Sequence, residues 1–412
     1  MNIAVAQSGG PTCAINSSLL GVFRQAAKYD NVDVIYGSVN GIEGLIKNNL
    51  VNLYDIITSD DEVELIRQTP STLLGSCRYK LPEYSKDPCV YETILKTLKE
   101  HEISAFFYIG GNDSMDTVMK LNRYFKDNNV DISVIGIPKT IDNDLPVTDH
   151  TPGFGSAAKY VATTMQEIIR DSSVYSIPSV TIVEIMGRDT GWLTASSATL
   201  RANGEIAPHL IYLPERKFSV KEFLEDVKAA QEKYYAVIVA VSEGIVLDPE
   251  EFDEDYQSGK VDNFGHKYLA GVAKALTKIV EKNLNCKVRA IELNVMQRCA
   301  SHISSKRDIT EAARIGAAAV STAMEGNTGK MMYFHRVTNH PYNVRIETTD
   351  VENAANRVKY FPAEWINERG NDVTQEAIDY CLPLIQGEQN FHMKNGIPQH
   401  YVLKCALPRG NE

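Results

Sequence analysis

The chain has 412 residues, more than one hydrophobic core usually organises, so two or three domains are expected. Hydrophobic residues make up 43% of the sequence and charged residues 23%, which excludes a collagen-like or intrinsically disordered chain. The 42 Lys and Arg against 53 Asp and Glu give a net charge of −11, which argues against a general nucleic-acid-binding surface. A local cluster of cations can still bind a small anionic ligand within such an acidic protein.

The sequence indicates a cytoplasmic protein with no membrane partner. No apolar run approaches the ~20 residues that a membrane helix needs, and residues 1–5 do not resemble the start of a secretion signal. The seven cysteines are scattered and contain no CxxC pair, which favours free thiols over a zinc site.

Short apolar runs mark the strands of a first lobe. They lie at residues 2–7, 32–36, 105–109 and 134–137. Helical patterns follow the first and third runs and reach about residues 29 and 125. Because the runs are nearly continuous rather than alternating, they favour parallel strands covered by helices on both faces.

A second set of such runs, at residues 180–184, 237–241 and 289–293, predicts a second lobe. Helices are expected at residues 156–170 and 308–325, and the acidic stretch 248–255 is interpreted as a solvated loop or helix start. We therefore predict an α/β fold of two Rossmann-like lobes with mainly parallel sheets and the active site in the cleft between them. The expected domains are residues 1–153 with part of 297–345, residues 154–296, and an unassigned C-terminal segment, 346–412.

Glycine-rich turns follow two of the predicted strands. In the first turn, residues 8–12, Gly9 and Gly10 let the backbone approach a ligand, and Pro11 suits the first position of a helix whose N-terminus favours phosphate. A plain tight turn explains this segment equally well. In the second turn, residues 110–114, Asp113 is either a simple helix cap or a functional carboxylate.

The loop at residues 138–144 carries the strongest chemical signal. It places a lysine, a hydroxyl, an amide and two carboxylates directly after a strand. Such a set can use one carboxylate as a proton acceptor and the lysine to offset phosphate charge. Other strand ends carry Arg188, Glu243 and Arg298, and Arg78 is a further candidate. Together these residues predict a cleft that holds two phosphorylated ligands.

In content, order and spacing, these motifs resemble those of the phosphofructokinase family, as far as about residue 326. The motifs are SGGP at residues 8–11, GGNDS at 110–114, PKTIDND at 138–144, MGR at 186–188, SEG at 242–244 and QR at 297–298. The resemblance implies transfer of a phosphoryl group to the 1-hydroxyl of fructose 6-phosphate with the help of Mg²⁺.

The resemblance also implies roles for individual residues. Asp142 is the general base, and Arg188 contacts the transition state or the sugar phosphate. The donor phosphates contact Gly10 and Arg78 in the first lobe. The sugar phosphate site, attributed mainly to the second lobe, comprises Thr140, Ile141, Asp142, Met186, Gly187, Arg188, Glu243 and Arg298.

Two positions resemble the pyrophosphate-dependent branch of this family. Members that use ATP usually carry glycine at the positions of Asp113 and Lys139. A carboxylate at position 113 would repel the additional phosphate of a nucleotide, while Lys139 can neutralise the small, highly charged pyrophosphate. Asp113 and Lys139 are therefore assigned to donor binding and catalysis, and the reaction is expected to be reversible. The alternatives are an ATP-dependent 6-phosphofructokinase and a regulatory subunit that binds sugar phosphate without catalysis.

The chain also departs from the family pattern. Asn112 replaces a common aspartate, so Mg²⁺ is expected to be held by Asp113, pyrophosphate oxygens and water, with Asn112 as a weaker ligand. Ser179 and Val295 replace residues of the sugar 6-phosphate site, which leaves Arg289 and the segment 330–412 as candidate sources of the missing cation. The family builds symmetric assemblies, so a homodimer or homotetramer is expected. The motifs do not distinguish fructose 6-phosphate from sedoheptulose 7-phosphate.

Overall fold

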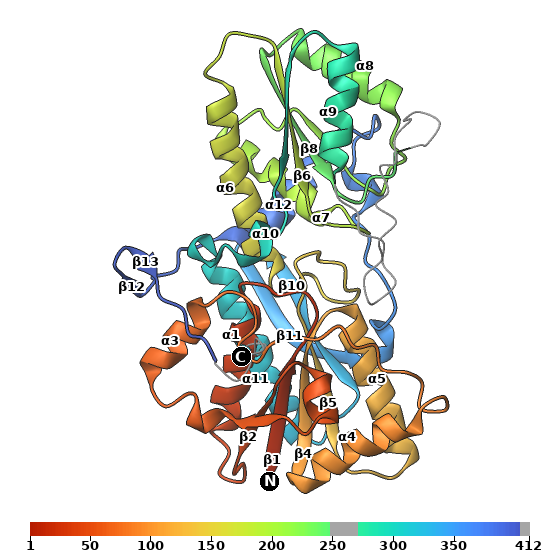
Figure 1. The fold of residues 1–412 in the computed structure, drawn as a ribbon, viewed down its shortest axis with the longest axis vertical. Helices are drawn as coiled ribbons and strands as arrows, with labels where there is room; N and C mark the ends of the chain where they lie inside the picture. The colour runs from red at the N-terminus through yellow and green to blue at the C-terminus, as the bar shows by residue number, and fades with distance from the viewer. Residues whose placement is uncertain (248–270, 404–412) are drawn as a thin grey trace, which may run out of the picture.

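The computed structural model describes residues 1–247 and 271–403, which form two α/β lobes joined along the long axis of the molecule (Figure 1). The larger lobe contains a seven-stranded sheet. Its strand order is β11 (Tyr342–Asp350), β10 (Lys330–Asn339), β5 (Ser133–Pro138), β4 (Ile103–Gly110), β1 (Asn2–Gln7), β2 (Ile35–Ser38) and β3 (Leu50–Asn52). Strands β10, β5, β4, β1 and β2 run parallel, whereas β3 and β11 pair antiparallel at the two edges.

Helices cover both faces of this larger sheet. The helices are α1 (Ile15–Ala26), α2 (Ile42–Ile46), α3 (Asp60–Gln68), α4 (Pro88–Glu100), α5 (Asn112–Asp127) and α11 (Lys306–Met324). One apolar core lies under α1, α3 and α11, and a second lies under α2, α4 and α5. Burial on both faces explains why β1 and β4 are nearly continuous apolar runs.

Helices α1 and α11 pack unusually closely because glycines lie at their contact. A Cβ atom on Gly21 would lie 2.0 Å from the carbonyl oxygen of Ala313, and one on Gly316 would lie 2.1 Å from that of Ser18. Only glycine fits at either position. The contact fixes α11, which follows the second lobe in the sequence, against the first helix of the larger lobe.

The smaller lobe contains a four-stranded sheet in which all pairs are parallel. Its order is β7 (Leu210–Tyr212), β8 (Ala236–Ser242), β6 (Ser179–Ile185) and β9 (Lys287–Glu292). The helices associated with the smaller lobe are α6 (Phe154–Ser172), α7 (Trp192–Ala195), α8 (Val220–Gln231), α9 (Val272–Asn283), α10 (Met296–Cys299) and, from the C-terminal segment, α12 (Gln375–Cys381). Every residue of β8 is buried, as expected for a central strand covered on both faces.

The C-terminal segment packs against both lobes. After β11 the chain passes to the smaller lobe, where α12 joins the core formed by α6 and β6. It then returns to the larger lobe through a short hairpin of β12 (Met393–Lys394) and β13 (Ile397–Pro398). Gln68 at the end of α3 fixes this hairpin, because its side chain bonds the backbone of His392 and Gln399.

The predicted fold class, two α/β lobes with mainly parallel sheets, is confirmed. The helices expected at 156–170 and 308–325 are α6 and α11, each within two residues of its predicted start.

Two local predictions are wrong. The second strand begins at Ile35 rather than residue 32, and Pro11 is not the first residue of a helix, since α1 begins at Ile15. The hydroxyl of Thr12 instead accepts hydrogen bonds from the N–H groups of Ala14 and Ile15. The acidic stretch 248–255 lies outside the described residues.

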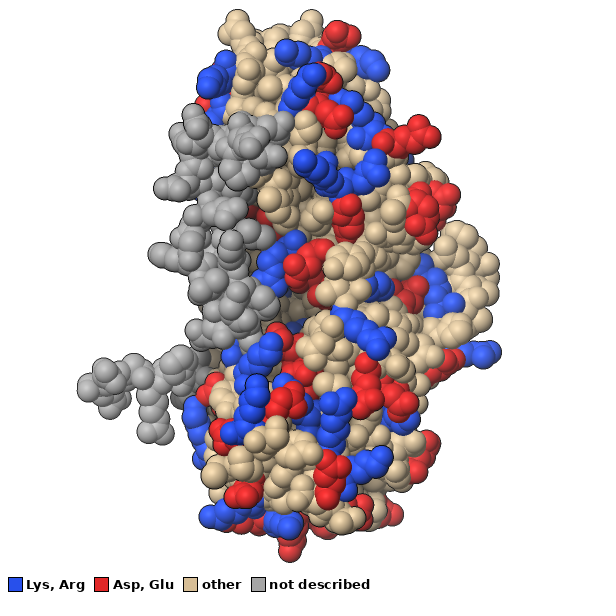
Figure 2. Space-filling view, turned by 90° about the vertical axis from the view of Figure 1, so that its right-hand side faces the viewer, with Lys and Arg blue, Asp and Glu red and all other residues tan. Residues whose placement is uncertain are grey.

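The described surface shows no single dominant charge on the face in Figure 2, where basic and acidic side chains are interspersed over both lobes. Within residues 1–247 and 271–403, none of the helices combines the length and the apolar character that crossing a bilayer requires.

Candidate active site

A cavity of about 520 Å³ lies where the two lobes meet. Its walls begin at the carboxyl ends of five parallel strands: Ser8 follows β1, Gly111 follows β4, Lys139 follows β5, Met186 follows β6 and Glu243 follows β8. Ligand sites of open parallel sheets form at such strand ends. The predicted placement of the site in the cleft between the lobes therefore agrees with the structure.

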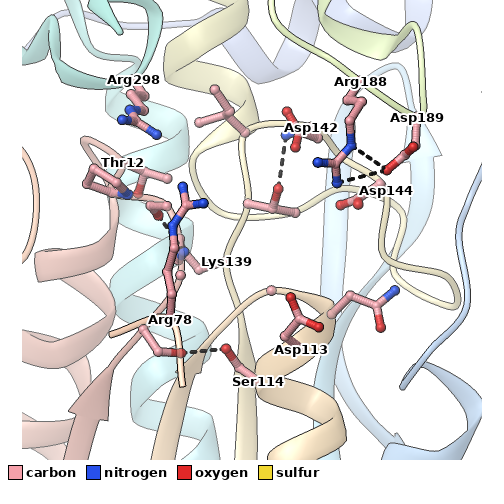
Figure 3. A pocket seen from close by; sticks show the side chains of 18 of the residues that line it. Thr12, Arg78, Asp113, Ser114, Lys139, Asp142, Asp144, Arg188, Asp189 and Arg298 are labelled. Carbon is pink, nitrogen blue, oxygen red and sulfur yellow. Dashed lines mark hydrogen bonds and ion pairs between the residues drawn. The ribbon is translucent and has the colours of Figure 1, made fainter. Parts of the chain in front are cut away.

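Cations gather on one side of this cavity. Arg78, Lys139 and Arg298 lie on the left in Figure 3, all among the residues that line the cavity. The ammonium group of Lys139 is buried and donates a hydrogen bond of 2.6 Å to the carbonyl oxygen of Gly10. Burial lowers the pKa of Lys139 to about 7, although the nearby carboxylates of Asp142 and Asp144 act in the opposite direction. An anionic ligand at this end would favour the charged ammonium.

The glycine-rich loop after β1 leaves room for these cations. A Cβ atom on Gly9 would lie 3.3 Å from the ammonium nitrogen of Lys139, and one on Gly10 would lie 3.6 Å from a guanidinium nitrogen of Arg298. Gly9 also has a φ of 73°, a backbone conformation that favours glycine. The loop thus brings its backbone close to two cations, and a side chain at Gly9 would crowd Lys139.

Carboxylates gather on the opposite side, where Figure 3 shows Asp142, Asp144 and Asp189 around Arg188. The N–H of Asp142 donates to the hydroxyl of Thr140 (3.1 Å), and its carbonyl oxygen accepts from the hydroxyl of Thr190 (3.1 Å). Burial, and next the charge of Asp144, raise the pKa of Asp142 to about 7. A carboxylate with such a pKa is suited to accept a proton near neutral pH.

Asp144 has an unusual environment for a carboxylate. Burial raises its pKa, and its Oδ1 atom is buried without a hydrogen-bond partner. Two buried carboxylates this close do not readily ionise together, which couples the protonation of Asp142 to that of Asp144.

The smaller lobe contributes a tight turn that holds Arg188. Gly187 has a φ of 126°, and a Cβ atom there would lie 2.5 Å from the carbonyl oxygen of Thr190, so only glycine fits. Its N–H donates to Glu243 (3.2 Å), and its carbonyl oxygen accepts from the hydroxyl of Ser242 (2.6 Å). Burial, and next the charge of Asp142, raise the pKa of Glu243 to about 8. The guanidinium of Arg188 contacts Asp189 at 3.3 Å and faces the cavity.

Most of the predicted site residues line this single cavity. They are Gly10, Arg78, Asn112, Asp113, Lys139, Thr140, Ile141, Asp142, Met186, Arg188, Glu243 and Arg298, with Gly187 in the adjoining turn. Arg289 does not join them. It lies on β9, pairs with Asp171 at 2.8 Å and borders a separate small cavity beside Ser179. Its contact with a sugar phosphate stays a prediction.

Sequence reasoning missed several residues of the cavity wall. Lys80, Asp189 and Thr190 lie within two residues of predicted positions, so proximity in the sequence could have indicated them. Asn356 and Val358 come from the unassigned C-terminal segment, and no motif marks them.

The start of α5 offers oxygen ligands for a hard cation. Asp113 projects from this helix start toward the space between the cations and the carboxylates (Figure 3). The side chain of Asn112 instead bonds the C-terminal backbone: its Oδ1 accepts from the N–H of Asn356 (2.6 Å) and its Nδ2 donates to the carbonyl oxygen of Arg357. Within the described ranges, no group of three or more His, Cys, Asp or Glu residues could hold a metal by itself. A single carboxylate fits a Mg²⁺ ion that takes its other ligands from phosphate oxygens and water.

The fold and the cavity define a protein that binds small, highly charged ligands between two α/β lobes. The family model described as Phosphofructokinase matches residues 2–323, and the chain belongs to this family. The predicted family membership is confirmed.

Similar proteins cover almost the whole chain. A pyrophosphate--fructose 6-phosphate 1-phosphotransferase of Halomonas elongata is 36% identical over 411 residues, which span 99% of this chain and 97% of the relative. The crystal structure of a pyrophosphate-dependent phosphofructokinase from Marinobacter aquaeolei matches with a TM-score of 0.86 and 35% identity, covering 100% of this chain and 98% of that one. A sulfofructose kinase of Alkalicoccus urumqiensis is 34% identical over 374 residues, 90% of this chain and 93% of the relative.

Proposed function

We propose that the protein transfers a phosphoryl group from pyrophosphate to the 1-hydroxyl of fructose 6-phosphate, giving fructose 1,6-bisphosphate and phosphate. The observation that carries the proposal is the pair of Asp113 and Lys139 at the donor end of the cavity. The names of the most similar relatives support the same donor and acceptor.

Asp142 acts as the general base of this reaction. Its carboxylate accepts the proton of the 1-hydroxyl as the sugar oxygen attacks the nearer phosphorus of pyrophosphate. The bond from that phosphorus to the bridging oxygen breaks, and the bridging oxygen leaves with the second phosphate. The pKa of about 7 lets Asp142 take up a proton in one direction of the reaction and return it in the other.

The cations stabilise the charge that moves during transfer. Lys139, fixed against Gly10, contacts the donor oxygens, and Arg188 faces them from the smaller lobe. Charge on phosphoryl oxygens spreads in the transition state, so positioned cations are the main contribution that a protein can make. Mg²⁺, when bound, would neutralise part of the phosphate charge, and Asp113 is the residue that would hold it, with Asn112 contributing at most the second lone pair of its Oδ1.

Asp113 also selects the donor. A nucleotide triphosphate carries one phosphate more than pyrophosphate, and we expect it to place further negative charge near this carboxylate. Pyrophosphate lacks this additional charge. It also lacks an adenosine group, so the ammonium of Lys139 contributes the binding that adenosine contributes for a nucleotide donor.

Formation of the phosphorylated sugar by the purified protein tests the proposal directly, because this product is the same with either donor. Fructose 6-phosphate with Mg²⁺ should be phosphorylated rapidly with pyrophosphate and at least ~10²-fold more slowly with ATP, since repulsion of a few kcal/mol corresponds to that ratio. Sulfofructose and sedoheptulose 7-phosphate are tested as alternative acceptors in parallel. Faster turnover with ATP would establish the ATP-dependent alternative, and sugar phosphate binding without turnover would establish the regulatory one.

A cytoplasmic location and a homodimer or homotetramer complete the proposal. Light scattering of the purified protein tests the assembly, since a monomeric mass would refute it.

A further inference from the structure

The segment from residue 356 to residue 361, here called the crossing segment, connects the two lobes beside the active site. At its start the backbone of Asn356 and Arg357 is bonded to the carboxamide of Asn112, and Asn356 also donates to Asp116 at 2.8 Å. At its end the N–H of Phe361 donates to Glu215 of the smaller lobe at 2.9 Å. The segment is therefore fixed to the larger lobe at one end and to the smaller lobe at the other.

Lys359 lies in the middle of the crossing segment and bonds the loop that carries Asp142. Its N–H donates to the carbonyl oxygen of Asp144 at 2.7 Å. Its ammonium group donates to Asn143 Oδ1 (3.2 Å) and to the carbonyl oxygens of Thr148 (3.1 Å) and Asp149 (2.8 Å). The backbone and the side chain of one residue thus hold the loop at four points.

Trp192 fixes Lys359 from the opposite side. The indole N–H donates to the carbonyl oxygen of Lys359 at 3.0 Å, and the ammonium lies 4.9 Å from the centre of the indole ring. Trp192 belongs to α7 of the smaller lobe. Lys359 therefore connects the loop that carries Asp142 to the smaller lobe.

Asn143 is the residue through which this coupling reaches Asp142. It is fully buried and has a φ of 55°, a left-handed conformation that asparagine tolerates better than most non-glycine residues. Its side chain accepts from Lys359 and from the N–H of Thr151 (3.1 Å) and donates to the hydroxyl of Tyr380 (2.8 Å). These bonds set the backbone turn that directs Asp142 into the cavity.

We infer that Lys359 is a positioning residue for phosphoryl transfer, holding the 142–144 loop in the conformation in which Asp142 meets the sugar hydroxyl. The inference rests on the proposed function and deepens it. Lys359 is absent from the described residues that line the cavity, whereas its neighbours Asn356 and Val358 are among them. It therefore acts through the loop rather than on a ligand.

The ammonium of Lys359 also contributes to the charge balance of the loop. It lowers the pKa of Asp144, which is coupled to Asp142, so removing it should raise the apparent pKa of the pair. The other charged groups that face the loop or Lys359 are Lys139, Asp149, Arg188, Asp189, Glu243 and Arg336. All of them remain in a variant of Lys359 alone, so a shift of the acidic limb of the pH profile would report the lost ammonium.

The test compares Lys359→Met with the wild-type enzyme using fructose 6-phosphate and pyrophosphate. We expect kcat to fall ~10- to 100-fold with both KM values near those of the wild type, since a misplaced catalytic group slows chemistry more than binding. The acidic limb of the kcat profile should move to higher pH. Lys330→Met is the control, because Lys330 pairs with Asp350 (2.6 Å), lies beside Ile135 in β5 and is absent from the described residues that line the cavity, so this variant should keep wild-type kcat and pH profile.

Two further variants separate charge from folding. Lys359→Gln keeps a donor for the loop oxygens without the charge, and it replaces Lys359→Met if that variant fails to fold. In Lys359→Ala, added ethylammonium should restore part of kcat by occupying the vacated space. Wild-type kcat and pH profile in the folded neutral variants would overturn the positioning role, as would a loss of activity that follows only the folded fraction measured by circular dichroism. Wild-type protein that transfers no phosphoryl group to fructose 6-phosphate would instead refute the proposed function, and the inference with it.

Discussion

The ammonium nitrogen of Lys139 lies 2.6 Å from the carbonyl oxygen of Gly10, so the cation that follows β5 is fixed against the loop that follows β1. These two strand ends are separated by β4 in the sheet, and both residues line the cavity. The cation is thus in place before a ligand arrives, which spares the ordering of a long side chain during binding.

Removing this cation should impair the use of pyrophosphate. In Lys139→Met we expect kcat/KM for pyrophosphate to fall ~10- to 150-fold, since a hydrogen bond from a charged group contributes ~1.5–3 kcal/mol. The KM for fructose 6-phosphate should change much less. Steady-state kinetics with each substrate varied in turn measures both values, and an unchanged kcat/KM for pyrophosphate would exclude Lys139 from the donor site.

Changing both donor residues should alter the choice of donor. In the double variant Asp113→Gly with Lys139→Gly, pyrophosphate use should weaken and ATP should become a usable donor, because the repelling carboxylate and the compensating ammonium are both absent. The ratio of kcat/KM for the two donors is the quantity to compare with the wild type. Full pyrophosphate-dependent activity in the double variant would defeat the proposed basis of donor selection.

Neutralising Asp142 should slow catalysis without abolishing binding. General bases typically contribute ~10²- to 10⁴-fold, so kcat of Asp142→Asn should fall within that range. Binding of fructose 6-phosphate, measured by calorimetry, should persist. Near-wild-type kcat would show that another group accepts the proton.

The same substitution should stabilise the fold at alkaline pH. The pKa of Asp142 is raised from its ordinary value to about 7, so the folded protein holds this proton more tightly than the unfolded chain does. Stability from the protonated carboxyl is therefore lost as the pH rises from about 4 toward 7. Asp142→Asn should raise the melting temperature more at pH 8 than at pH 4, as measured by thermal unfolding. An equal change at both pH values would contradict the raised pKa.

The sequence predicts most of the fold and the site because both depend on local signals. Apolar runs such as β8 report burial on two faces, and the polar residues placed directly after strands, such as Lys139 and Glu243, converge because parallel strands end at one edge. What the sequence does not reveal depends on contacts between distant segments. Lys359 follows Asp144 by more than two hundred residues, and only the folded chain brings the N–H of Lys359 to the carbonyl oxygen of Asp144.

The start of α1 also departs from the local sequence signal. The pattern around Pro11 suits a first helical turn, yet α1 begins only at Ile15, and the hydroxyl of Thr12 accepts hydrogen bonds from the N–H groups of Ala14 and Ile15 in the turn before it. The loop before it brings Gly9 and Gly10 to the cations of the cavity. Tertiary contacts with the site thus override a local preference.

The carboxamide of Asn112 has a structural role that can be tested. Its carboxamide both accepts from Asn356 and donates to Arg357, and a carboxylate can only accept. Asn112→Asp should therefore loosen the crossing segment and lower kcat ~2- to 10-fold, the effect of one lost hydrogen bond. Hydrogen exchange should accelerate at residues 356–361. Asn128→Asp is a matched control, because Asn128 also donates its amide to a backbone carbonyl, that of Tyr124, but at the far end of the same helix. Equal exchange at 356–361 in the Asn112→Asp variant and the wild type would show that the carboxamide does not hold the segment.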